Sequence, residues 1–137
     1  GAASTASVCV LKQGLALSPA SARGWMLFAE QNSRTDPVRA AQALTMSFEL
    51  DGFSYWLVDR RIRDAASLWS VMSTAGKNDT FKPVKLLWQT PDLRPRIEPL
   101  LAENGVAAIF SQTYIGDPEN LRAINRWRAE LIRQRNP

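Results

Sequence analysis

Residues 53–63 hold the densest group of side chains that could recognise a ligand. Three of these side chains are aromatic and three are basic: Phe53, Tyr55, Trp56, Arg60, Arg61 and Arg63. Guanidinium groups match carboxylates and phosphates, and an exposed aromatic pair beside them suits a peptide or the face of a sugar. This stretch is therefore the first candidate for a binding site.

A surface helix with internal ion pairs would explain the same residues. Arg60 would pair with Asp64, because side chains four residues apart face each other on a helix. Asp59 and Arg63 have the same spacing, which leaves Arg61 without a charge partner. For the aromatic residues, the alternative is packing in the core or at an inter-helix turn. Both interpretations remain open at this level.

Catalytic chemistry has little support. The 137 residues contain no histidine and one cysteine, Cys9, which lies in an apolar context that predicts burial. Without histidine there is no Ser-His-Asp or Cys-His pair, and the usual zinc ligand and general base are missing. Carboxylates occur singly, and no glycine-rich phosphate loop or cluster of metal ligands is found. We therefore predict no catalytic residue, no metal site and no cofactor, and a protein that is not an enzyme.

The charge is unevenly distributed. The net charge of +4 comes from residues 59–137, which carry thirteen basic and nine acidic residues, whereas residues 1–58 are balanced. This asymmetry makes nucleic acid or an acidic partner a candidate. No run approaches the roughly eighteen apolar residues of a membrane span, so no transmembrane segment is expected.

The terminal segment argues against nucleic acid. A basic stripe is predicted on a helix over 118–135 by Arg122, Arg126 and Arg133, with Glu119 and Glu130 beside it. Trp127 lies on the opposite, apolar side, and Arg128 points toward that side. A nucleic-acid surface needs unpaired cations with stacking aromatic rings between them.

Capping signals and apolar spacing predict an all-α fold. A capping residue precedes proline four times, at Ser18-Pro19, Asp36-Pro37, Thr90-Pro91 and Asp117-Pro118. Gly52, Gly105 and Gly116 fall where helices should end in a left-handed residue. Helices are predicted over 7–17, 19–32, 37–49, 55–72, 83–89 and 118–135. Residues 73–80 are predicted to be the longest loop, Pro95 to open a helix, and 106–110 to be either helix or strand.

Residues 7–52 resemble the tetratricopeptide repeat, a helix–turn–helix unit. The positions that match its pattern are Trp25, Phe28, Ala29, Ala40, Leu44 and Ser47, together with the junction Leu15-Ala16-Leu17-Ser18-Pro19. Asn32 and Gly52 stand where the repeat has tyrosine and proline. The length of 137 residues predicts a single domain over 1–137. The expected fold is an array of six or seven short antiparallel helices that begins with tetratricopeptide-like pairs. Residues 7–72 would form repeat-like pairs, and 81–137 a degenerate helical extension.

The function that this resemblance implies is non-catalytic protein binding, by a scaffold whose groove is lined by the first helix of each pair. The candidate binding residues are Tyr55, Trp56, Arg60, Arg61, Arg23 and Asn32. The expected partner is a protein or peptide, in a bacterial envelope assembly, the periplasm or the cytoplasm. The alternatives are a basic helical nucleic-acid-binding domain and, with 106–110 as a strand, a small α/β enzyme.

Overall fold

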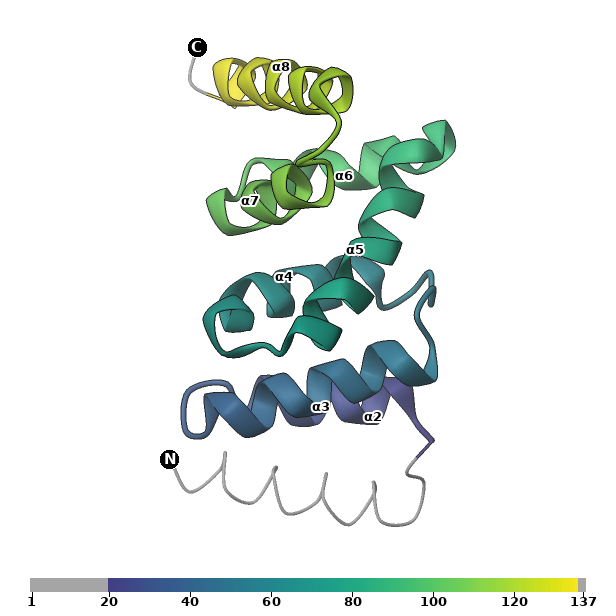
Figure 1. The fold of residues 1–137 in the computed structure, drawn as a ribbon, viewed down its shortest axis with the longest axis vertical. Helices are drawn as coiled ribbons and strands as arrows, with labels where there is room; N and C mark the ends of the chain where they lie inside the picture. The colour runs from purple at the N-terminus through teal and green to yellow at the C-terminus, as the bar shows by residue number, and fades with distance from the viewer. Residues whose placement is uncertain (1–19, 136–137) are drawn as a thin grey trace. The chain divides into compact units, whose positions relative to one another are not determined.

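The computed structural model describes residues 20–135, and all regular secondary structure in this part of the chain is helical (Figure 1). The chain forms two compact units that divide between Thr80 and Phe81. The first contains α2 (Ala22–Asn32), α3 (Pro37–Leu50), α4 (Val58–Leu68), the 3-10 turn η1 (Trp69–Val71) and the start of α5 (Thr74–Gln89). The second contains the rest of α5, the 3-10 turn η2 (Pro91–Leu93), α6 (Arg94–Leu101), α7 (Asn104–Thr113) and α8 (Pro118–Arg135). The all-α prediction is confirmed.

Helices α2 and α3 lie side by side and antiparallel (Figure 1). Ser21 caps α2 by accepting a hydrogen bond from the Gly24 N–H, at 2.9 Å. Asp36 caps α3 in the same way, and Pro37 occupies the first turn, as the sequence predicts. Helix α2 thus begins at Ala22 rather than at Pro19, and the predicted helix 7–17, the Ser18-Pro19 cap and Cys9 lie outside the described residues.

Both α2 and α3 carry small buried side chains, and the two helices pack against each other. Ala29, Ala40 and Ala43 are nearly or wholly inaccessible to solvent, which lets the two backbones approach closely. Across this contact the Ser47 hydroxyl donates to the Ala22 carbonyl at 2.7 Å. The larger side chains of the core lie around these residues and include Met26, Phe28, Leu44, Phe48 and Ile62.

The loop predicted over 73–80 is wrong, because this stretch forms the first turns of α5. Its start is capped by Ser73, whose hydroxyl accepts the Gly76 N–H at 3.1 Å. Gly76 also packs against α3: a Cβ placed on it would lie 2.4 Å from the Thr45 Oγ1. Thr80 is buried, and its hydroxyl donates a hydrogen bond to the Gly76 carbonyl. The polar side chains of Ser73 and Thr80 therefore form hydrogen bonds with the backbone of α5. The close approach of Gly76 to α3 determines where the start of α5 lies in the first unit.

In the second unit, the apolar run 106–110 is helical, which resolves the choice left open by its sequence. Val106, Ile109 and Phe110 are buried, and Gly105 lies inside α7 instead of ending a helix. Helices do end shortly before Gly52 and Gly116, as predicted, but none of the described glycines has a positive φ, so the left-handed conformation predicted for these ends is wrong. Helix α6 does begin around Pro95, and α8 begins at Pro118 after Asp117, which accepts the Asn120 N–H.

Candidate functional site

A groove of about 620 Å³ lies in the first unit, where α2 begins and where α3 is connected to α4. It is lined by Ser21, Ala22, Arg23, Asp51, Ser54, Trp56, Leu57 and Arg60. Three of the six predicted binding residues, Arg23, Trp56 and Arg60, therefore meet in one place. We call this surface the α2–α4 groove.

The α3–α4 connection carries the aromatic side chains outward. Phe53, Tyr55 and Trp56 are 57%, 49% and 86% exposed, so packing of Trp56 in the core is excluded. The connection turns through a hydrogen bond from the Leu57 N–H to the Ser54 carbonyl, at 3.1 Å. The Tyr55 and Trp56 rings meet edge to face, with centroids 5.3 Å apart. This contact limits the orientations of the exposed indole.

Arg60 extends from α4 to α2, where its guanidinium makes a two-pronged bond with the Glu30 carboxylate at 2.6 and 2.8 Å. The predicted partner, Asp64, was therefore wrong. Glu30 is 30 residues away in sequence, and only the packing of α2 against α4 brings it within reach. Arg60 is held beside the groove by a planar pair that fixes its direction.

Asp64, on α4, also interacts with Glu30. Burial, together with the hydrogen bond and the negative charge of Glu30, raises the pKa of Asp64 to about 8, while the charge of Arg60 acts in the opposite direction. The carboxyl of Asp64 is therefore protonated at neutral pH. It lines a small pocket of about 110 Å³ between α2 and α4 together with Glu30, Ser33 and Ser67.

Arg61 is not a surface residue, and its assignment to the binding site is corrected here. Its side chain is fully buried, with Nη1 donating to the Ser47 carbonyl at 2.9 Å and the guanidinium 4.6 Å above the Phe48 ring. Burial lowers the pKa of Arg61, and the negative charge of Asp51 partly offsets this. Nε and Nη2 are buried without a hydrogen-bond partner. Arg61 thus holds the end of α3 against α4.

Asn32 is the second correction. It is buried at the end of α2, and its Nδ2 donates to the Phe28 carbonyl at 2.9 Å. The amide therefore stabilises the last turn of the helix and is not available to a ligand.

The second unit contains an aromatic cluster that the sequence did not single out. The Trp88 and Trp127 ring centroids are 5.6 Å apart, and the Arg94 guanidinium lies 4.8 Å above Trp88. Trp88 Nε1 donates to the Asn120 side chain at 2.9 Å, and Asn120 in turn bonds Asp117. Those bonds lower the pKa of Asp117. The polar atoms of this network bond each other, so it stabilises the unit rather than offering a site.

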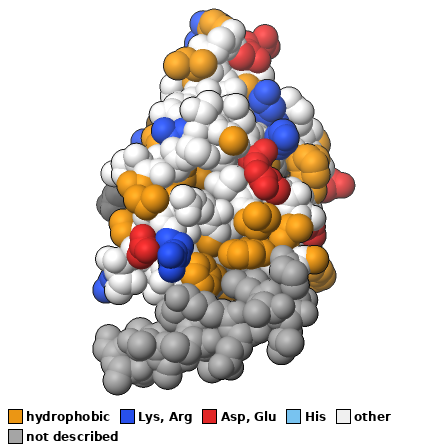
Figure 2. All heavy atoms as spheres, turned by 60° about the horizontal axis from the view of Figure 1, so that its bottom comes forward, with side chains coloured by type: hydrophobic (Ala, Val, Ile, Leu, Met, Phe, Trp, Pro, Cys, Tyr) orange, Lys and Arg blue, Asp and Glu red, His pale blue; other side chains and the backbone are white. Residues whose placement is uncertain are grey.

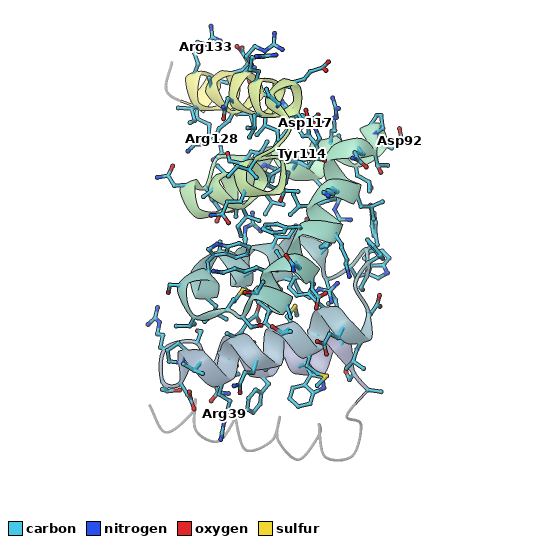
Figure 3. All side chains as sticks on the ribbon, in the orientation of Figure 1. Arg39, Asp92, Tyr114, Asp117, Arg128 and Arg133 are labelled. Atoms are coloured by element: carbon cyan, nitrogen blue, oxygen red, sulfur yellow. The ribbon has the colours of Figure 1, made fainter. Side chains whose placement is uncertain are left out.

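Figure 3 shows Tyr114 and Asp117 close together where α7 leads into α8, and Arg128 on the side of α8 that faces α7. Burial raises the pKa of Tyr114. Arg128 donates from Nε to the Leu101 carbonyl at 3.0 Å and from Nη2 to the Asn104 side chain. Its position on the inner face of α8 agrees with the prediction from its spacing.

The charged surface is mixed. On the face drawn in Figure 2, Lys and Arg side chains lie beside Asp and Glu side chains, with hydrophobic side chains exposed between them. On α8, Arg133 pairs with Glu130. Over residues 20–135, no three acidic, cysteine or histidine side chains gather as a metal site. In the same range, every helix is too short or too polar to cross a membrane.

Comparison with known proteins gives no relative from which a function could be transferred. No protein-family model matches the chain, and neither a curated protein nor a solved structure matches it. The assignment of a function must therefore rest on the geometry of the α2–α4 groove.

Proposed function

We propose that this protein is a non-catalytic protein-interaction module of the tetratricopeptide type, which binds a segment of another protein in the α2–α4 groove. The observation that carries the proposal is the exposure of Trp56, 86%, on the rim of a groove of about 620 Å³. Tryptophan and arginine are the side chains most enriched among the residues that dominate binding energy at protein interfaces. Here one tryptophan and two arginines line the same groove.

The shape of the site supports a peptide or loop as the ligand. Its volume falls within the range of about 300–1,000 Å³ that is typical of ligand sites. Helices α2 and α4 support its walls, and the Arg60–Glu30 pair joins them. Its lining combines apolar side chains, such as Trp56 and Leu57, with charged ones, and protein interfaces also combine an apolar core with a polar rim.

The test is affinity capture from the source cell with matched variants. The bait is the full chain as wild type, as Trp56→Ser and as Val38→Ser. Val38 is 54% exposed and lines a different groove of the same unit, of about 340 Å³ between α3 and η1. Circular dichroism first verifies that each variant is folded. Capture is run at low and moderate salt, with and without nuclease.

We expect a discrete protein to be recovered with the wild type and with Val38→Ser, and to be lost with Trp56→Ser. Recovery that survives salt and nuclease would support a protein interface. Equal recovery with all three baits would show that the α2–α4 groove does not bind the partner. Recovery that disappears with nuclease would favour the nucleic-acid alternative.

A further inference from the structure

We propose that the α2–α4 groove selects an acidic linear peptide segment, with a large apolar side chain against Trp56 and a neighbouring carboxylate at Arg23. This inference rests on the proposed function and adds the chemistry of the partner. The carboxylate that Arg23 would bind belongs to an Asp or Glu side chain inside the partner segment, not to the C-terminus of the partner chain.

The balance of charges around the groove is the first step. Arg60 is neutralised by its two-pronged bond to Glu30. Asp51 lies close enough to the buried Arg61 to offset part of the effect of burial on the pKa of that guanidinium. The charge of Arg60 is thus matched by Glu30, whereas Asp51 lines the groove as an exposed carboxylate whose charge acts on the buried Arg61 behind it.

Arg23 is the exception. It lines the groove and is exposed, and among residues 20–135 it has no hydrogen-bond or ion-pair partner. Its five N–H donors are therefore free to bind a carboxylate in the two-pronged geometry that arginine favours. The three arginines at and behind the groove outnumber the two neighbouring carboxylates, Glu30 and Asp51, by one, and this excess positive charge complements an acidic ligand.

The backbone at the N-terminus of α2, next to Arg23, also favours a negatively charged ligand. Ser21, Ala22 and Arg23 are the N-cap and the first two residues of α2, and all three line the groove. The positive end of the helix dipole and the N–H groups of a first turn favour a negative charge nearby. Ser21 satisfies the Gly24 N–H, which leaves the preceding N–H groups without an intrahelical acceptor.

The aromatic side chains of the groove are the reason why we expect a large apolar side chain in the bound peptide. Trp56 exposes most of its indole, Tyr55 supports the ring edge to face, and Leu57 lines the groove beside it. A large apolar side chain placed there would bury aromatic surface that is now in water. A basic side chain could also stack on Trp56, but it would meet the unpaired charge of Arg23. The combination therefore favours an apolar side chain flanked by acidic ones.

The test measures binding of fluorescent peptides of about a dozen residues to the full chain by anisotropy, at physiological salt. The peptides are acetylated and amidated, so that no terminal charge contributes. They carry a central Phe flanked by Glu, by Gln or by Lys, and a fourth carries a central Ala flanked by Glu. The protein variants are Arg23→Gln, Trp56→Ser and Arg34→Gln. Arg34 is exposed between α2 and α3 and does not line the groove. Its substitution by Gln removes the same charge as Arg23→Gln and therefore serves as the control.

We expect the Glu–Phe peptide to bind the wild type at least about tenfold more tightly than the Gln–Phe peptide. Arg23→Gln should reduce this ratio to about threefold or less, Arg34→Gln should preserve it, and Trp56→Ser should remove binding. Equal or tighter binding of the Gln–Phe or Lys–Phe peptide, or the same loss in Arg34→Gln as in Arg23→Gln, would overturn the inference. So would tight binding of the Glu–Ala peptide.

Failure of this inference can be distinguished from failure of the proposed function. If no peptide of the panel binds, while capture from the cell still depends on Trp56, the partner chemistry is wrong and the interaction function stands. If capture is also independent of Trp56, both are wrong.

Discussion

The protonated carboxyl of Asp64 makes a quantitative prediction about stability. Its pKa is raised from 3.8 to about 8 in the folded protein, so the native state keeps a proton that the unfolded state releases between these two pH values. The resulting stabilisation is complete below pH 3.8. It decreases as the pH rises through the interval and is lost above pH 8. The free energy of unfolding should therefore fall with increasing pH over this range.

The magnitude follows from the size of the pKa change. At 1.36 kcal/mol for each factor of ten, a pKa that rises from 3.8 to about 8 sets an upper bound of about 5–6 kcal/mol. Solvent reaches part of the Asp64 side chain and screens its interaction with Glu30. We therefore expect an effect of about 2–3 kcal/mol, a large share of the stability of a small domain.

The perturbation is Asp64→Asn. An amide can still donate a hydrogen bond to Glu30, but it does not titrate, so the variant should lack this part of the pH dependence. We expect the difference in unfolding free energy between Asp64→Asn and the wild type to shift in favour of the variant by about 2–3 kcal/mol from pH 4 to pH 9. Urea denaturation followed by circular dichroism measures it at each pH.

The control is Glu49→Gln, which removes one negative charge from an exposed position on α3. A shift of the same size in this control would mean that net charge, not the Asp64–Glu30 contact, causes the effect. Parallel curves for Asp64→Asn and the wild type would show that Asp64 is ionised at neutral pH, which would refute the reasoning. A carbon-detected NMR titration of the Asp64 carboxyl supplies an independent value of its pKa.

Substitutions at Gly76, Arg61 and Ala40, with matched controls for the first two, test the packing that positions the groove. Gly76→Ala would place a Cβ 2.4 Å from the Thr45 Oγ1, so it should cost about 1–3 kcal/mol, whereas Gly116→Ala meets nothing within 4 Å and should have little effect. Arg61→Ala should cost about 3 kcal/mol or more by leaving a cavity, whereas Arg61→Met, which fills the site without a buried charge, should stay within about 1 kcal/mol of the wild type. Ala40→Leu should overpack the α2–α3 contact by about 1–3 kcal/mol. Chemical denaturation measures all three, and an unchanged midpoint in the first or the last would contradict the close packing described above.

Much of the helical architecture could be predicted from local signals. Asp36 and Asp117 do cap α3 and α8, each followed by a proline, because a cap depends only on residues within one turn. Sequence signals for a helix start are less reliable where tertiary contacts determine which residues become helical. Thr90 makes no side-chain cap bond, and only the short turn η2 follows it. Residues 73–80 look like a loop because they are polar, whereas Gly76 packs against Thr45 and the buried Thr80 bonds within the helix.

The residues that line the candidate groove could be predicted only in part, for the same reason. Trp56, Arg23 and Arg60 could be chosen by residue type, and the structure brings them to one groove. The partner of Arg60 could not be predicted, because Glu30 comes from another helix and Asp64, at the expected spacing, has an uncharged carboxyl. Local spacing therefore identifies which side chains lie on a surface, but it does not determine which of them remain available.

Arg61 shows that helical spacing can predict the burial of a side chain better than its charge does. The buried stripe of α4 recurs at intervals of three and four and consists of Val58, Arg61, Ile62, Ala65 and Leu68. Arg61 falls inside this stripe, one step of about 100° from Arg60, so its periodicity predicts burial even though its charge suggests the surface. Its guanidinium has the aromatic face of Phe48 and the Ser47 carbonyl to compensate for the loss of water. Because that charge is taken up at the end of α3, the acidic ligand proposed above would be held by Arg23, and the peptide experiment therefore tests that arginine.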